Sequence, residues 1–174
     1  MRGIKKRVLF VGVWMIFSVL LLLMSGCEKA KVTPNAVFSS PLDGEILFTV
    51  NGEIYRITLH LSPENEGEKR KGELIYLSPR GMEGISVISD DRGRRIRLHG
   101  TESETENESL LLPFFLFQSG EIAGKDIGED EIVYRYTDGR RVYYSVKTEQ
   151  MTRILYRDAE CKIEWLDVRR GQER

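Results

Sequence analysis

The side chains able to do catalysis or bind a metal are few in this sequence and stand far apart. The chain has 174 residues, with two histidines, His60 and His99, and two cysteines, Cys27 and Cys161. Each histidine alternates with apolar neighbours, a pattern that predicts a solvated position on the polar face of a strand. No nucleophile-elbow or phosphate-loop motif is present, and no set of ligands stands at metal-site spacing. We therefore predict no catalytic residue, no metal site, no cofactor and no enzymatic activity.

Two groups of charged residues are dense enough to raise the question of binding. Glutamates occupy every second position over Glu102–Glu108, but this run has no glycine at the sharp turn that a calcium loop requires. We interpret residues 101–108 as a solvated acidic surface loop. Four arginines lie within Arg92–Arg97, where they are suited either to binding phosphate or to forming cross-strand ion pairs.

The formal charge of −1 conceals two unlike parts of the chain. Residues 1–27 hold four basic side chains and no acidic one, so the remainder carries 22 basic and 27 acidic side chains, a net charge of −5. Because an acidic domain repels polyanions, we expect no nucleic-acid partner.

The amino-terminal residues have the organisation of an export signal. Four basic residues precede the 17-residue apolar run Val8–Met24, and the small residues Ser25 and Gly26 follow it. The charges favour the cytoplasmic face while the apolar run inserts into the membrane as a helix. A retained transmembrane helix is the alternative, since the run reaches the lower limit of a membrane span.

The position of Cys27 favours cleavage over retention. The sequence Met24-Ser25-Gly26-Cys27 resembles the bacterial lipobox, although lipoboxes prefer leucine where Met24 stands. The resemblance implies that residues 1–26 are a signal peptide and that Cys27 is acylated and becomes the first residue of a lipoprotein. It also implies a lipid anchor on the extracytoplasmic side of a bacterial cell membrane. With Cys27 acylated, Cys161 has no disulfide partner, and we expect it to be a small buried apolar residue.

Residues 27–43 are expected to form the lipidated cysteine and a flexible tether, and residues 44–170 a single antiparallel β-rich domain. The tether region mixes charged, small and turn-forming residues without a period. From residue 45 onward, apolar and polar side chains alternate as in strands with one buried face, and Asn51-Gly52 predicts a tight hairpin. The nine predicted strands span 45–50, 53–61, 72–78, 84–89, 94–99, 131–136, 140–147, 151–157 and 161–168.

One segment, Ser109–Gln118, breaks this alternation. It is apolar on all sides, Ser109 suits a helix N-cap, and Pro113 is tolerated in an early helical turn, so we predict a short helix. A short apolar run is also compatible with a buried strand. The expected fold class is mainly β (α+β), with a curved antiparallel sheet or incomplete barrel packed on one short apolar helix. The residues expected to contact an apolar ligand are Leu111, Phe114, Phe115 and Phe117.

The order of these elements resembles that of the LolA-like half-barrel lipoproteins, a superfamily of lipoprotein carriers and receptors. The resemblance is carried by residues 48–57, 81–85 and 147–168, and it covers most of residues 44–169. It implies an incomplete antiparallel barrel that is wrapped over helices and encloses an apolar cavity. This chain is shorter than the carriers and has one predicted helix where they have several, which implies a smaller cavity.

Two functions remain open at this point. In the first, the anchored protein binds an apolar ligand or a lipidated partner in a groove between the sheet and the helix. In the second, the helix fills the sheet, and the protein is a structural or interaction lipoprotein whose partner is another envelope protein. A cavity of roughly 300 Å³ or more beside residues 110–117 favours the first function, and a filled core favours the second.

Overall fold

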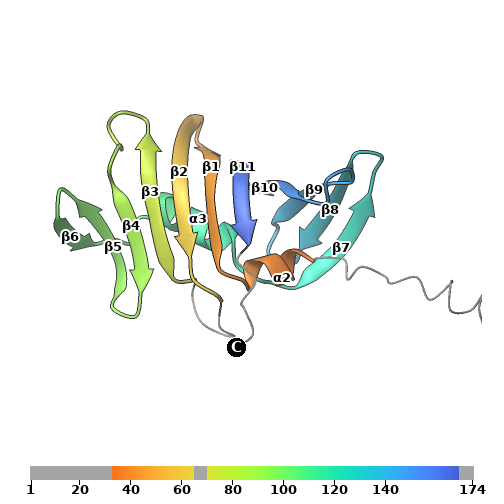
Figure 1. Cartoon of the computed structure of the whole chain (residues 1–174), viewed down its shortest axis with the longest axis horizontal. Helices are drawn as coiled ribbons and strands as arrows, with labels where there is room; N and C mark the ends of the chain where they lie inside the picture. Colours follow the sequence, from red (N-terminus) through yellow and green to blue (C-terminus); the bar gives the residue numbers. More distant parts are fainter. Residues whose placement is uncertain (1–32, 65–69, 169–174) are drawn as a thin grey trace, which may run out of the picture. The chain divides into compact units, whose positions relative to one another are not determined.

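The computed structural model of the protein describes residues 33–64 and 70–168. These residues form one open, curled sheet of eleven antiparallel strands and two short helices (Figure 1). The expected class, a mainly β fold built on a curved antiparallel sheet, is confirmed. Residues 1–26 and Cys27 lie outside the described ranges, so the signal peptide and the lipidation site stay predictions. Within those ranges, no helix is long and apolar enough to span a membrane.

The elements follow one another along the chain as short helices and strands of four to ten residues. In order they are α2 (Pro34–Phe38), β1 (Leu42–Val50), β2 (Glu53–Leu61), β3 (Gly72–Ser78), β4 (Ser86–Asp90), β5 (Gly93–Leu98), β6 (Thr101–Glu104), α3 (Glu108–Leu116), β7 (Ile122–Ile127), β8 (Glu131–Tyr136), β9 (Arg141–Ser145), β10 (Met151–Tyr156) and β11 (Ala159–Val168).

The first and last strands lie next to each other at the centre of the sheet. Strands β1 to β6 follow one another outward to one edge, the chain passes through α3 to the opposite edge, and β7 to β11 return inward. There β11 pairs with β1, with Phe48 opposite Cys161. The first hairpin turns at Asn51-Gly52 with positive φ at both residues, 52° and 80°, as the sequence predicts.

The sequence pattern predicts nine strands, two fewer than the structure contains. Strand β6 lies in the segment interpreted as an acidic loop. Its four residues are exposed, and its Glu102 forms ion pairs with Arg95 and Arg97 of β5, so charge pairing takes the place of apolar alternation. Strand β7 was missed because Gly124–Asp126 interrupts the alternation and the strand carries a bulge after Ile122.

The C-terminal part of the expected tether is structured. Thr33 caps the short helix α2, and the Asn35 side chain exchanges hydrogen bonds with the backbone of Gly120 (Nδ2 to O, 2.8 Å; N to Oδ1, 3.3 Å). Phe38 is fully buried and meets the Phe117 ring edge-to-face, with 6.0 Å between ring centres. This part of the chain therefore belongs to the domain, because Phe38 fills a core site that the local sequence pattern does not reveal.

The predicted helix is confirmed as α3, with a different first turn. Its N-cap is Asn107 rather than Ser109, and the Asn107 Oδ1 accepts hydrogen bonds from the amides of Ser109 and Leu110 at 3.1 and 3.3 Å. Since asparagine and serine are both strong caps, local preference alone does not choose between them.

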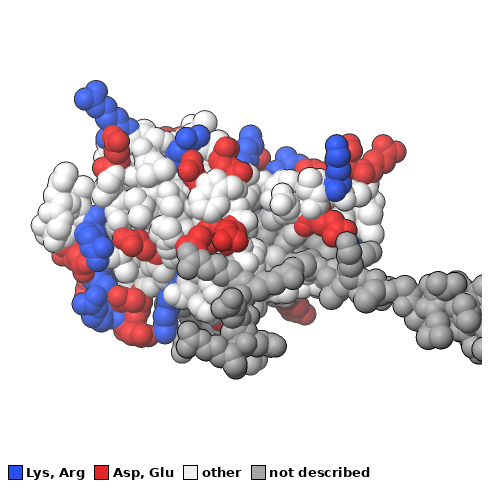
Figure 2. Space-filling model, viewed as in Figure 1, with Lys and Arg blue, Asp and Glu red and all other residues white. Residues whose placement is uncertain are grey.

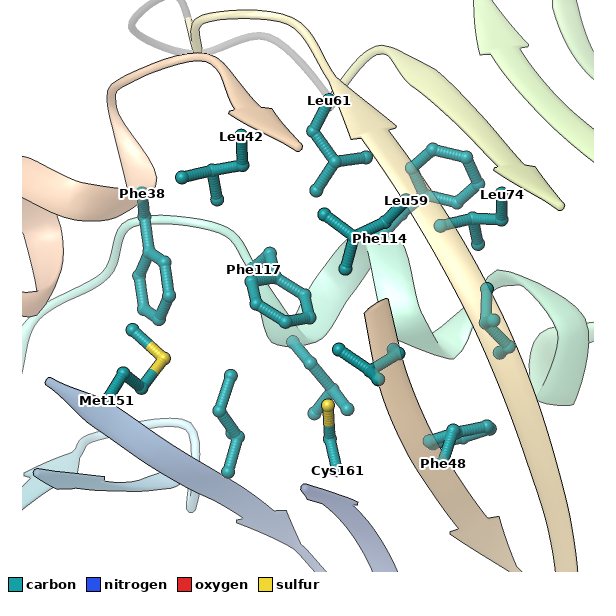
Figure 3. Close-up of a cluster of buried hydrophobic side chains, with 14 of the residues drawn as sticks. Phe38, Leu42, Phe48, Leu59, Leu61, Leu74, Phe114, Phe117, Met151 and Cys161 are labelled. Carbon is teal, nitrogen blue, oxygen red and sulfur yellow. The ribbon is translucent and has the colours of Figure 1, made fainter. Parts of the chain in front are cut away.

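The core lies between the sheet and the two helices. Every second residue of β1 is buried, as the alternation predicts, and Leu42 and Phe48 are among the least exposed residues of the protein. Phe114 and Phe117, from α3 and its C-cap, are fully buried against them. Figure 3 shows these side chains together with Phe38, Met151 and Cys161, contributed by both ends of the described chain.

A buried arginine, Arg140, binds the C-terminal end of α3. The residue is 1% exposed, and its guanidinium donates hydrogen bonds at 3.1 Å to the carbonyls of Phe115 and Leu116. It also donates to the carbonyls of Gln118 and Ser119. The last carbonyls of a helix lack intrahelical donors and carry partial negative charge. The buried guanidinium supplies hydrogen-bond donors to these carbonyls and a positive charge that offsets theirs.

The same guanidinium joins α3 to the rest of the domain. The Asp138 carboxylate supplies its counter-charge at 2.8 Å from the turn between β8 and β9. The guanidinium carbon lies 4.6 Å from the ring centre of Tyr136 and 6.0 Å from that of Phe38 in α2. Arg140 therefore contacts α2, α3 and the β8–β9 turn through one side chain.

We expect Arg140→Gln to lower the free energy of unfolding by about 3 kcal/mol or more, because it leaves several buried carbonyls without a donor and Asp138 without a partner. Urea denaturation of the purified protein measures this change. Arg141→Gln is the matched control, since Arg141 is the exposed neighbour and its loss costs less than about 0.5 kcal/mol. Equal losses in the two variants would contradict this role of Arg140.

Candidate functional site

A groove of about 1290 Å³ lies along α3. At one end it is lined by Asp91 and Arg92 of the β4–β5 turn, and at the other by Asn51 of the β1–β2 turn and Asp158 of the β10–β11 turn. The two ends of the groove lie at opposite ends of β2. Asp91 contacts Lys71, which precedes β3, and the start of β3 pairs with the end of β2. Asn51 lies in the turn that precedes the start of β2. The groove therefore follows the length of the strands.

Part of the groove wall is apolar. Helix α3 contributes Leu111, Leu112 and Phe115, and the sheet contributes Val50 and Tyr156 from the ends of β1 and β10. The rings of Phe115 and Tyr156 meet edge-to-face with 5.0 Å between their centres. The groove thus combines a patch of apolar side chains with a larger number of polar and charged ones, a lining suited to a ligand that has both an apolar and a polar part.

Charged side chains surround this apolar wall. Lys71 and Asp91 form an ion pair at 2.7 Å, and Arg92 lies 3.6 Å from Asp90. The Arg157 guanidinium lies 5.0 Å from the centre of the Tyr156 ring. The other charged residues that line the groove are Arg94, Glu104, Glu106, Glu108 and Asp158.

The four residues predicted to contact a ligand divide between the groove and the core. Leu111 and Phe115 line the groove, with Leu111 7% exposed. Phe114 and Phe117 are fully buried in the core and do not line the groove. The helix thus presents one apolar side to the core and another to the groove.

Three further groove residues were missed at the level of sequence. Leu112 stands in the predicted helix and was a candidate by composition alone. Val50 and Tyr156 end strands that are remote in sequence, and only the pairing of β11 with both β1 and β10 brings these strands together. No local signal in the sequence marks them.

Of the two roles predicted for the arginines of Arg92–Arg97, the structure shows ion pairing for Arg92, Arg95 and Arg97. The Arg95 guanidinium binds the Asp90 carboxylate bidentately at 2.6 and 3.0 Å and also reaches Glu102 at 2.9 Å. Arg97 joins Glu102 at 2.7 Å and Glu73 at 3.4 Å. Figure 2 shows basic and acidic side chains intermingled on the face it views, as such pairing produces.

This network shifts the pKa of its carboxyl groups. Hydrogen bonds from Arg95 are the main cause that lowers the pKa of Asp90 to about 2, with further contributions from the Arg92 amide and the two positive charges. Hydrogen bonds from Arg97 and then Arg95 lower the pKa of Glu102. Asp90 lines the groove, so the same contacts that stabilise the β4–β5 turn also hold that end of the groove.

The remaining candidate residues lie apart from the groove. His60 is exposed and forms a 2.6 Å contact between its Nδ1 and the Asp43 carboxylate. Cys161 is buried as predicted, and burial raises the pKa of its thiol well above the ordinary range, which disfavours the nucleophilic thiolate. Over residues 33–64 and 70–168, no three histidine, cysteine, aspartate or glutamate side chains are grouped as a metal site would need.

The fold and the groove together define a class of protein: an open, curled antiparallel sheet with a groove, lined by apolar and charged side chains, along its longer helix. No protein-family model matches the chain, and no curated protein matches its sequence. The structure is similar to three solved structures, at TM-scores of 0.45, 0.44 and 0.36.

The first of these is an uncharacterized conserved protein from Thermus thermophilus, 14% identical, with 76% of this chain and 80% of that chain covered. The second is MucB, 11% identical, covering 79% of this chain and 56% of MucB. The third is a putative outer membrane lipoprotein-sorting protein domain from Vibrio parahaemolyticus, 14% identical, covering 83% and 92%. These identities and TM-scores are too low to carry a family or a function to this chain.

We expect acid to loosen the β4–β5 turn through Asp90. The pKa of Asp90 is about 2 in the folded protein and about 3.9 in an unfolded chain. The stabilisation is therefore complete above about pH 4 and is lost as the pH falls through 4 toward 2. Hydrogen exchange of the β5 amides at pH 5 and pH 2.5 measures this loss.

Asp90→Asn should weaken this dependence on pH, because the titrating group is gone. Asp91→Asn is the control, since the Asp91 side chain is 86% exposed and forms no ion pair with Arg95. If Asp90→Asn leaves the pH dependence of β5 exchange unchanged, the assignment to Asp90 is wrong.

Proposed function

We propose that this protein is an extracytoplasmic lipoprotein, anchored to the cell membrane through Cys27, that binds the apolar part of an amphiphilic ligand or of a lipidated partner. The observation that carries this proposal is the groove of about 1290 Å³, whose wall is formed by Leu111, Leu112 and Phe115. Such a volume exceeds that of most small-molecule sites, which span roughly 300–1000 Å³. The proposed role is binding rather than catalysis, and nucleic acid is not among the proposed partners.

The short link between anchor and domain supports this proposal. In the sequence, residues 28–32 separate Cys27 from Thr33, the N-cap of α2. Six steps of fully extended chain span at most about 20 Å. An acylated Cys27 would therefore keep Thr33 within about 20 Å of the membrane surface, where acyl chains are available.

A second function, that of a structural or interaction lipoprotein, is favoured by a different observation. Phe114 and Phe117 are fully buried in the core, so that side of the helix presents no exposed surface to a ligand. In this alternative the edge strands β6 and β7, most of whose residues are exposed, pair with another envelope protein.

A photoreactive palmitate probe, with its diazirine in the tail, distinguishes the two functions. We expect the protein in nanodiscs to be labelled within the groove, as located by peptide mass spectrometry. Leu112→Gln should lower the labelling by about tenfold, because the tail loses an apolar contact worth about 1.5 kcal/mol.

Leu77→Gln is the matched control, since Leu77 is 40% exposed on β3 and does not line the groove. The control should be labelled as strongly as the unaltered protein. Labelling that is absent from the groove, or equal in the two leucine variants, would rule out the ligand-binding function and leave the second one.

The lipid anchor has a direct test in the intact mass of the protein extracted from membranes. We expect the mass of a chain that begins at Cys27 and carries acyl groups. Cys27→Ser should abolish both acylation and cleavage, because serine offers no thiol to be acylated. An unmodified Cys27 in a chain that retains residues 1–26 would end the lipoprotein proposal.

A further inference from the structure

Arg94 differs from the other arginines of its hairpin in the face that it occupies. It stands on β5 opposite Ser89 of β4, and both residues line the groove. Arg95 and Arg97 are at odd positions of the same strand and form the ion pairs with Asp90, Glu102 and Glu73 on the other face. Strand alternation therefore places the Arg94 guanidinium on the face of the sheet that carries the groove.

The Arg94 guanidinium lacks the partners that its neighbours have. Among the described residues it forms no ion pair and no side-chain hydrogen bond, whereas Arg92, Arg95 and Arg97 each meet a carboxylate. Its Nε is closed off from solvent and has no acceptor. A buried donor without an acceptor is unfavourable, and Arg94 is the groove residue among the described arginines that has such an atom, so a hydrogen-bonding ligand at this guanidinium would be stabilising.

A guanidinium in this state is suited to an anionic oxygen group. Its planar fork binds two oxygens of a carboxylate or a phosphate at once, and the charge strengthens both hydrogen bonds. The apolar wall of Leu112, Phe115 and Tyr156 belongs to the same groove. One ligand with a negatively charged head and an apolar tail can therefore satisfy both features.

The other charges of the groove limit how negative that head can be. Glu104, Glu106, Glu108 and Asp158 also line it, and none of them has an ion-pair partner within the part of the chain that the structure describes. Their combined field repels a second negative charge near Arg94. A head with one negative charge gains the hydrogen bonds of Arg94 at a smaller repulsive cost than a dianion.

We infer that Arg94 binds the head of a singly charged anionic amphiphile, such as a long-chain carboxylate, whose tail lies against the apolar wall. This inference rests on the proposed function and deepens it by naming the class of ligand. It assigns Arg94 to recognition of the head, and the acidic residues of the groove to rejection of more highly charged heads.

Three photoreactive probes with the same sixteen-carbon tail test this assignment on the full chain in nanodiscs. They are palmitate, hexadecanol and hexadecyl phosphate, which carry one, no and up to two negative charges. Each variant is compared with the unaltered protein for the same probe, so that partition of the probe into the bilayer cancels. Labelling of groove peptides is the readout.

We expect Arg94→Gln to lower palmitate labelling by about tenfold, which corresponds to one charge-assisted contact, and to leave hexadecanol labelling within about twofold. Arg135→Gln is the matched control, because Arg135 is 55% exposed, is ion-paired with Asp126 and does not line the groove. It should alter neither probe. We expect Glu106→Gln to raise the labelling by hexadecyl phosphate.

The outcomes separate this inference from the function on which it rests. If hexadecanol and palmitate label the groove but Arg94→Gln affects them equally, the role of Arg94 is wrong and the proposed function stands. If hexadecyl phosphate labels better than palmitate, the preference for a single charge is wrong. If no probe labels the groove, the proposed function fails and the inference fails with it.

Discussion

The arrangement of this domain depends on how one buried cation, Arg140, is bound. The chain must cross from one edge of the sheet to the other between β6 and β7, and α3 makes this crossing with its last carbonyls inside the protein. Those carbonyls need donors, and Arg140 supplies them. Because the same guanidinium also contacts Asp138 and the Phe38 ring, the position of α3 is coupled to that of α2 and of the β8–β9 turn.

Once its end is held, the helix has two apolar sides with different uses. Phe114 and Phe117 pack into the sheet, and Leu112 and Phe115 form the wall of the groove. This explains why the segment is apolar on all sides, a composition that in a surface helix would expose large side chains to water. The helix therefore separates the packed core on one side from the groove on the other.

The sequence predicts those parts of the fold that depend on local alternation. The hairpin at Asn51-Gly52, the strands flanking it and the apolar helix follow from residue pattern and turn chemistry. Strands β6 and β7 and helix α2 do not. The Arg95–Glu102 ion pair takes the place of apolar alternation in β6, a bulge interrupts the alternation in β7, and Phe38 of α2 is buried against Phe117, which is distant in the chain. The groove is predicted in part for the same reason: α3 is local, whereas Val50 and Tyr156 meet it only through the strand order.

The alternation of side chains along β5 places its arginines on both faces of the sheet, although they form one cluster in the sequence. Arg95 and Arg97 project to one face, where carboxylates of β3, β4 and β6 neutralise them and fasten the edge of the sheet. Arg94 projects to the other face, where Val87 and Ile96 of the neighbouring positions are apolar, and no carboxylate of the described residues is bound to it. An arginine that served only to stabilise the edge of the sheet would gain more from ion pairs on the face that carries Arg95 and Arg97. Its place beside the apolar wall is the arrangement that a ligand with one charged end and one apolar end requires.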